Sequence, residues 1–219
     1  MTGTNSKTRA FTAVIALIAA AVLVLQYVLL IRLTLDTVGP MFATVRFFTY
    51  FTILSNVLVL LTTGTCALAP QSEPAAFFAR PVVRGGIALC IAVTMGIYAT
   101  VLARLWQPQG AQWWADTGLH YAVPTLYLAW WLFAVPHGVL RWSDLLRWLS
   151  FPLVYVVWVF LRGSWVQEYP YPFLDLTAHD VATVLRNVCG VIVVFLIVGS
   201  MLVLTDHLLG RRRRVEAAT

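Results

Sequence analysis

Side chains that could carry out acyl transfer lie on the second long apolar segment of this chain, residues 47–69. Thr49, Thr52 and Asn56 follow one another at positions i, i+3 and i+7, which is one face of a helix. Arg46 precedes them by one turn on the same face and could hold a carboxylate. Because a hydroxyl is a weak nucleophile at neutral pH, this face needs a base from another segment before it could attack a carbonyl.

That base could come from the fourth apolar segment, residues 116–135. Asp116, His120 and Pro124 repeat at i, i+4 and i+8, with Tyr127 close behind. Pro124 has no N–H, so the carbonyl of His120 loses its usual helical donor and must be satisfied by protein or by water. We therefore expect His120 to face a polar cavity rather than lipid.

The two faces predict a nucleophile, a base and an orienting group. Thr49 and His120 each lie about one turn inside the same end of their segments, so at 1.5 Å per residue their levels agree within roughly 5 Å. If the faces meet, Thr49 would attack, His120 would take its proton and Asp116 would orient the imidazole. The oxyanion donors are open, and Asn56 and Tyr127 are candidates.

Each of these residues also has a plainer structural explanation. The hydroxyl of a threonine in a membrane helix commonly donates to the carbonyl three or four residues back, which for Thr49 is that of Arg46 or Val45. Asp116 could be a helix N-cap, and Asn56 could serve only to join two helices.

A metal site is a further alternative at the same level of the chain. A zinc ion could be held there by His120 and His179 together with one of three acids, Asp116, Asp175 or Asp180. However, no pair of histidines has the HxxxH or HExxH spacing that places two ligands on one helix face. We therefore expect neither a metal nor another cofactor.

The composition is that of a membrane protein. The chain has 219 residues, of which 60% are hydrophobic and only 11% charged, and its mean hydropathy is +0.82. A soluble domain of this size could not cover that much apolar surface, and a helix needs about 20 apolar residues to cross the hydrocarbon layer. We therefore expect an all-α fold, one domain over residues 1–219, with six transmembrane helices at about 10–32, 47–69, 84–104, 116–135, 147–162 and 184–206.

The basic residues indicate the orientation of these six helices. An even number of spans places both termini on one side, and that side holds ten of the fifteen basic residues. The positive-inside rule makes this side cytoplasmic, where we expect contact with anionic lipid rather than with nucleic acid. The ten are Lys7, Arg9, Arg80, Arg84, Arg141, Arg147 and Arg211–Arg214.

The opposite side carries a polar rim in which charges balance. The remaining five arginines are expected to pair there with five acids, which are Asp36, Asp116, Glu168, Asp175 and Asp180. The loop Tyr171–Asp175 belongs to this rim and is stiffened by Pro170 and Pro172. It could cover an outward-facing pocket or be a rigid turn at the membrane surface.

Four short blocks of the sequence, taken in order, resemble one family of membrane proteins. They are the aromatic-rich Phe47–Phe51, then Gly118–His120 followed by Pro124, then Tyr155–Trp158, and finally the loop Tyr171–Asp175. The family is that of the androgen-induced and androgen-dependent TFPI-regulating proteins, threonine hydrolases that cleave fatty acid esters of hydroxy fatty acids. The interval between His120 and Pro124 is one residue shorter here than in the family.

This resemblance implies an ester hydrolase with a six-helix membrane fold, in which Thr49 and His120 are catalytic and the substrate is a membrane lipid or fatty ester. It also implies a distant, bacterial member that resides in the plasma membrane as a multi-pass protein. The residues themselves leave another function open, that of a non-catalytic lipid-binding protein or small transporter built around the same polar pocket.

Overall fold

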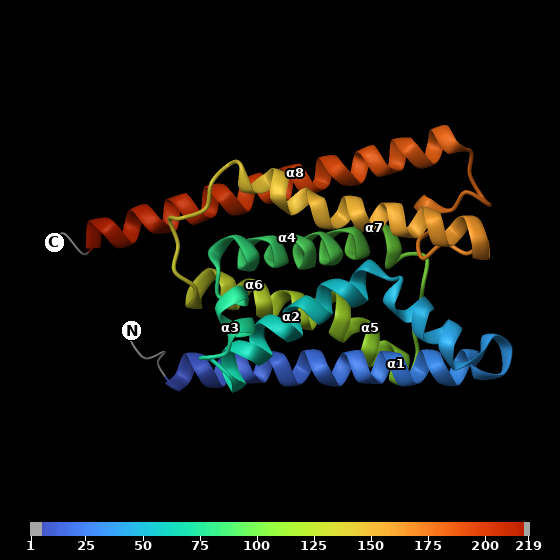
Figure 1. Cartoon of the computed structure of the whole chain (residues 1–219), viewed down its shortest axis with the longest axis horizontal. Coiled ribbons are helices and arrows are strands. Elements are labelled where there is room, and N and C mark those ends of the chain that lie inside the picture. The colour runs from blue at the N-terminus through green and yellow to red at the C-terminus, as the bar shows by residue number, and fades with distance from the viewer. Residues whose placement is uncertain (1–5, 217–219) are drawn as a thin grey trace. The chain divides into compact units, whose positions relative to one another are not determined.

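The computed structural model describes residues 6–216, with the backbone only at residues 35 and 212–216. Within this range the chain is helical and contains no strand, which confirms the expected all-α fold (Figure 1). The side chains of Arg212–Arg214, part of the expected basic tail, lie outside the described residues. The helices are α1 Ser6–Phe48, α2 Phe51–Leu68, α3 Glu73–Phe78, α4 Pro81–Ile97, η1 Tyr98–Leu102, α5 Ala111–Thr117, η2 Gly118–Ala122, α6 Val123–Ala134, α7 Asp144–Val166, η3 Pro172–Leu174 and α8 Val181–Glu216.

Five of these helical stretches are long and apolar enough to cross a membrane, as in a multi-pass integral membrane protein. They are Ser6–Thr34, Phe51–Leu68, Pro81–Leu102, Asp144–Val166 and Val181–Arg211. The expected segment 116–135 is also helical, but it consists of three consecutive helices, α5, η2 and α6. The chain divides into two compact units, one ending at His137 and the other beginning at Gly138.

In the first unit, α1 reverses direction near its C-terminal end. Gly39 has a φ of +74°, a left-handed conformation that glycine adopts readily, and Pro40 then starts a second helical stretch. This stretch packs back along the first, because the hydroxyls of Tyr27 and Thr44 lie 2.9 Å apart and the rings of Tyr27 and Phe47 are 5.1 Å apart, edge to face.

The reversal changes where the second helix begins. Residues 47 and 48 complete α1, Thr49 lies in a turn, and α2 starts at Phe51 rather than at residue 47 as expected. Phe47 joins a buried cluster with Leu23, Ile53 and Leu119, which holds α1, α2 and η2 together. This cluster places the start of α2 beside the middle of the first span.

Two π-helical turns interrupt the long helices of the first unit. In η1 the N–H of Ala103 donates to the carbonyl of Tyr98, and in η2 the N–H of Val123 donates to that of Gly118. A π turn makes room for one extra residue in an α-helix and often occurs at functional sites. Both turns here carry aromatic side chains that meet in the site described below.

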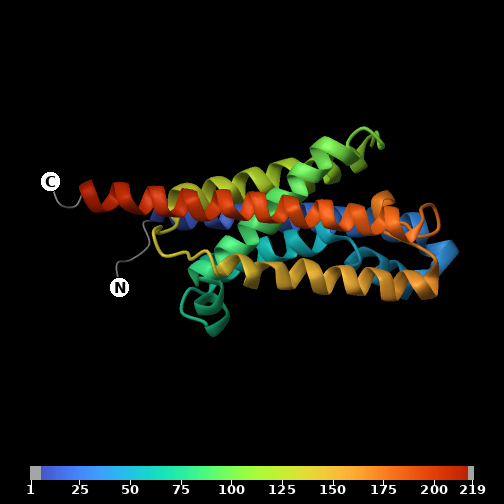
Figure 2. The same ribbon diagram turned by 90° about the horizontal axis from the view of Figure 1, so that it is seen from above.

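The second unit consists mainly of α7 and α8, which run side by side (Figure 2). Helix α7 covers Asp144–Val166 and is longer than the expected 147–162. Arg162, which was expected at the end of this helix, lies within it and is buried. The guanidinium of Arg162 donates to the carboxylate of Glu168 at 3.1 Å, which is one of the expected rim pairs. At the other end, the carboxylate of Asp206 accepts hydrogen bonds from the N–H groups of Val139 and Leu140, each at 2.9 Å.

Candidate functional site

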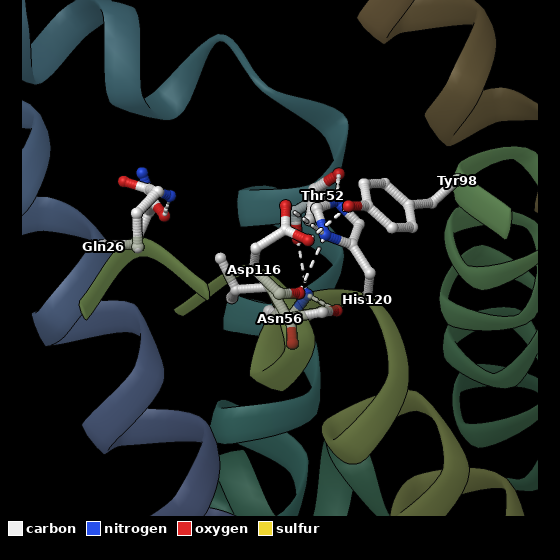
Figure 3. Close-up of polar contacts among 8 residues, drawn as sticks. Gln26, Thr52, Asn56, Tyr98, Asp116 and His120 are labelled. Carbon is white, nitrogen blue, oxygen red and sulfur yellow. Dashed lines mark hydrogen bonds and ion pairs between the residues drawn. The ribbon is translucent and has the colours of Figure 1, made fainter. Parts of the chain in front are cut away.

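The imidazole of His120 is held by hydrogen bonds at both of its nitrogens. Nδ1 lies 3.0 Å from the backbone carbonyl oxygen of Asp116 and 3.3 Å from its carboxylate Oδ1. Because a carbonyl oxygen can only accept, Nδ1 carries the hydrogen, and in the neutral imidazole the lone pair is then on Nε2. Nε2 lies 3.3 Å from the hydroxyl of Thr52 (Figure 3). Thr52 therefore donates to Nε2, and the order carboxylate, imidazole, hydroxyl is that of a catalytic triad.

Tyr98 completes this group from a third helix. Its ring stacks on the imidazole of His120 with 3.7 Å between the ring centroids and 11° between the planes. Its hydroxyl donates to Oδ2 of Asp116, the carboxylate oxygen that does not face His120. Asp116 is buried, so this bond satisfies an oxygen that water reaches poorly. The carboxylate of Asp116, which was expected to orient His120, thus contacts a tyrosine as well as the histidine.

Asn56 joins the two segments that carry the triad-like residues. Its Nδ2 donates to the carbonyl of Thr52 at 2.8 Å and to that of Leu119 at 3.1 Å. In η2 the helical bonds run to the fifth residue, so Pro124 deprives Leu119 of a donor, and Asn56 supplies it. The sequence predicted that Pro124 would leave the carbonyl of His120 without a donor. In the structure the carbonyl affected is that of Leu119, one residue earlier, and Asn56 donates to it.

The side-chain oxygen of Asn56 is a notable exception in this well-paired group. Oδ1 is fully buried and has no hydrogen-bond partner among the residues that the structure describes. Exchanging the amide oxygen and nitrogen would place Oδ1 against two carbonyls, so the observed orientation is the favourable one. Asn56 therefore acts here as a donor, and not as the expected oxyanion-hole candidate facing the reacting atoms with its N–H groups.

Thr49 lies one turn before Thr52, outside α2. Its side chain is 1% exposed, and its hydroxyl donates to the carbonyl of Val45 at 2.8 Å, one of the two structural bonds expected for it. The hydroxyl that the structure places beside Nε2 of His120 is that of Thr52.

For three further predicted residues, the structure gives contacts with groups other than His120. The hydroxyl of Tyr127 donates to the carbonyl of Arg84 at 3.3 Å, and Arg84 precedes Tyr98 by 14 residues, roughly 21 Å along α4. Tyr127 is therefore not brought to His120. Arg46 is in the last turn of α1 and accepts a bond from the N–H of Thr49 through its carbonyl. Asp175 belongs to the second unit.

Asp175 forms a local turn in its own loop. Its Oδ1 accepts hydrogen bonds from the hydroxyl and the N–H of Thr177, at 2.6 and 2.8 Å. The hydroxyl bond is the main cause that holds the pKa of Asp175 below its ordinary value. Both bonds are those of a rigid turn, the plainer of the two expected explanations for this loop.

The site lies beside the middle of the first helix rather than near its end. A side chain on Gly118 would meet that of Val22, and the amides of Gln112 and Gln26 form a hydrogen bond of 2.7 Å. Val22 is near the centre of the span Ser6–Thr34. The η2 turn and its histidine are therefore packed at mid-span of α1.

Sequence reasoning missed Tyr98 as a site residue and ranked Thr49 above Thr52. A weak signal for Tyr98 exists, because Thr94 and Tyr98 are four residues apart and share a helix face. Thr94 Oγ1 indeed lies 3.0 Å from the hydroxyl of Ser55 on α2. Among the described residues, no three His, Cys, Asp or Glu side chains are grouped so that they could hold a metal ion.

Comparisons of this chain with models of protein families, with curated proteins and with solved structures found no match.

Proposed function

We propose that this protein is a membrane-embedded hydrolase of lipid carboxylic esters, with Thr52 as nucleophile and His120 as general base. The observation that carries the proposal is the imidazole of His120, with Nδ1 fixed by Asp116 and Nε2 facing the Thr52 hydroxyl at 3.3 Å. Such bonds are often long in the free enzyme and shorten when substrate binds.

The reaction would follow two steps of acyl transfer. Thr52 Oγ1 attacks the ester carbonyl carbon while Nε2 of His120 accepts the hydroxyl proton. The carbon–oxygen bond to the alcohol then breaks, and the imidazolium returns the proton to the departing oxygen. Water attacks the acyl-threonine with the same base, which releases the fatty acid and restores Thr52. Asp116 stabilises the imidazolium throughout.

The family resemblance proposes Thr49 as nucleophile instead, and the geometry favours Thr52. Thr49 donates its hydroxyl hydrogen to Val45, whereas Thr52 donates to a nitrogen that can accept a proton. Arg46, one turn before Thr49, is the proposed partner of a substrate carboxylate.

The membrane arrangement completes the proposal. We propose that residues 111–134 form a sixth span, that both termini are cytoplasmic and that the basic residues on that side bind anionic lipid, with no role for nucleic acid. The substrate would be a membrane lipid or fatty ester that enters from the bilayer, and the resemblance suggests a bacterial plasma membrane. Membership of the threonine hydrolase family remains part of this proposal.

Hydrolysis of a fluorogenic medium-chain ester by the purified protein in detergent micelles tests the function. Thr52→Val and His120→Gln should each lower kcat by about a thousandfold or more, since either change removes a member of the reacting group. The matched control is Thr63→Val. Thr63 is also a buried threonine of α2, but its hydroxyl donates to the carbonyl of Val59 at 2.8 Å and not to a histidine. It should retain kcat within about threefold.

The same variants separate the alternatives. A fluorophosphonate should label the wild type and Thr49→Val but not Thr52→Val. If labelling and turnover survive in Thr52→Val and disappear in Thr49→Val, the nucleophile is Thr49. Full turnover in all the threonine variants and in His120→Gln would refute hydrolysis at this site.

A non-catalytic lipid-binding protein is the second candidate function. It is favoured by the distance of 3.3 Å between the Thr52 hydroxyl and Nε2 of His120, which is long for a hydrogen bond to a hydroxyl. This function predicts that lipid co-purifies with the protein, that no covalent probe reacts, and that Thr52→Val binds lipid as well as the wild type does.

A further inference from the structure

We infer that Tyr98 is a positioning residue that holds both Asp116 and His120, an inference that rests on the proposed function. From a separate helix, Tyr98 contacts two of the three triad-like side chains, Asp116 and His120 (Figure 3). It is itself buried, at 5% exposed, and is placed by the π turn η1 that it begins.

The hydroxyl of Tyr98 decides how the carboxylate of Asp116 is used. Oδ2 accepts from Tyr98 and Oδ1 faces Nδ1 of His120. Without the hydroxyl, Oδ2 would be a buried acceptor lacking its donor, and the carboxylate would gain by rotating away from the imidazole. The hydroxyl therefore acts on His120 through Asp116.

The ring of Tyr98 acts on His120 directly. Parallel stacking at 3.7 Å fixes the plane of the imidazole and covers one of its faces, so that Nε2 stays directed at Thr52. The π electrons of the ring also favour the imidazolium that forms when Thr52 loses its proton. The edge of Tyr121 packs against the same tyrosine, with 5.5 Å between the ring centroids.

Tyr98→Phe separates these two contributions, because it keeps the stacked ring and removes only the hydroxyl. We expect kcat to fall by about 10- to 100-fold, as for the loss of a hydrogen bond to a charged group, while KM stays within about twofold. The matched control is Tyr121→Phe, the same change on a neighbouring tyrosine, which should leave kcat and KM unchanged.

A measurement that needs no turnover distinguishes this inference from the proposed function. In protein labelled with ¹⁵N-histidine, the Nδ1–H resonance of His120 is identified by its loss in His120→Gln. Tyr98→Phe should shift this resonance, whereas Tyr121→Phe should not. If the wild type hydrolyses no ester, the proposed function fails, and the resonance still decides whether Tyr98 positions His120.

A double-mutant cycle tests the route through Asp116. In the Asp116→Asn background, Tyr98→Phe should change neither the resonance nor kcat further, since the carboxylate on which the hydroxyl acts is gone. A resonance that does not move in Tyr98→Phe, together with kcat within twofold of the wild type, would overturn the inference. So would effects of the two substitutions that simply add.

Discussion

A methyl group at residue 118 would collide with the first helix. Gly118 has helical dihedral angles, with φ −60°, so alanine is permitted by the backbone. The added Cβ would lie 2.3 Å from Cγ1 of Val22 and 3.0 Å from its Cβ. Because carbon atoms pack at about 3.5 Å or more, η2 and α1 would have to separate by roughly 1 Å in Gly118→Ala.

The energetic cost of this separation follows from two opposing effects. Overpacking of a buried contact costs about 1–3 kcal/mol, and alanine recovers about 0.5–1 kcal/mol relative to glycine within a helix. We expect a net destabilisation of about 1–2 kcal/mol. If the protein is the proposed hydrolase, the effect on turnover should be larger, because His120, the proposed base, is two residues away. A displacement of about 1 Å at a catalytic group can lower the rate by about a hundredfold.

Thermal unfolding in micelles and turnover of the fluorogenic ester measure the two effects. Gly96→Ala is the matched control, because a Cβ on this glycine of α4 meets nothing within 4 Å. Adding Val22→Ala to Gly118→Ala removes the closest atom and should restore part of both stability and activity. A Gly118→Ala protein as stable and as active as the wild type would show that η2 does not pack closely on α1.

Three other substitutions test separate contacts. Asn56→Leu removes two hydrogen bonds worth about 1 kcal/mol each, but it also removes a buried oxygen that lacks a partner. Turnover should therefore fall about tenfold, with a smaller change in thermal stability. Unchanged turnover would contradict the role of Asn56 in joining α2 to η2. Glu168→Gln leaves the buried Arg162 without its charged partner and should destabilise the protein by about 1–3 kcal/mol in thermal unfolding. Equal stability would show that this half-exposed carboxylate does not stabilise the fold. The lowered pKa of Asp175 means that its charged form stabilises the loop above the ordinary pKa of 3.8 and that this contribution is lost as pH falls through the lowered pKa. Asp175→Asn should abolish that acid-dependent change, followed through the amide resonance of Thr177, and the same titration in variant and wild type would refute it.

Periodicity predicted the faces of the site well. Asp116, His120, Thr52 and Asn56 were each expected on an inward polar face, and the structure brings them together. This succeeds because polar groups in an apolar helix must find partners, so their spacing marks the side that faces protein. The contact between the side chains of His120 and Asp116 could be predicted from their i, i+4 spacing alone.

Which of the two threonines, Thr49 or Thr52, faces His120 could not be predicted in the same way. The expected helix 47–69 treated Thr49 and Thr52 as equivalent positions on one face, but the chain leaves the helical path between Phe48 and Phe51. No glycine or proline at these positions signals a break. The residues that fix the chain before the break are distant in sequence, since Phe47 packs with Leu23 of the first stretch of α1 after the reversal at Gly39.

Tyr98 was missed because its contribution depends on irregular helix geometry. The rule that residues three or four apart share a face assumes regular α-helix on both sides of the contact. Tyr98 begins one π turn and His120 lies within another, so the two rings meet through two local departures from that geometry. Pro124 offered a hint for the second turn, and no residue type did so for the first.

The reversal of α1 at Gly39 has a consequence for the supply of any ligand. Because Phe47 packs beside Leu23, which is 11 residues from the Thr34 end of the first span, α2 begins roughly 16 Å below that end. This depth is about that of one leaflet of hydrocarbon. If the substrate is the proposed membrane lipid or fatty ester, its mole fraction among the acyl chains determines how often it reaches this depth. Its partition coefficient into the bilayer, more than its aqueous concentration, then sets the occupancy of the site.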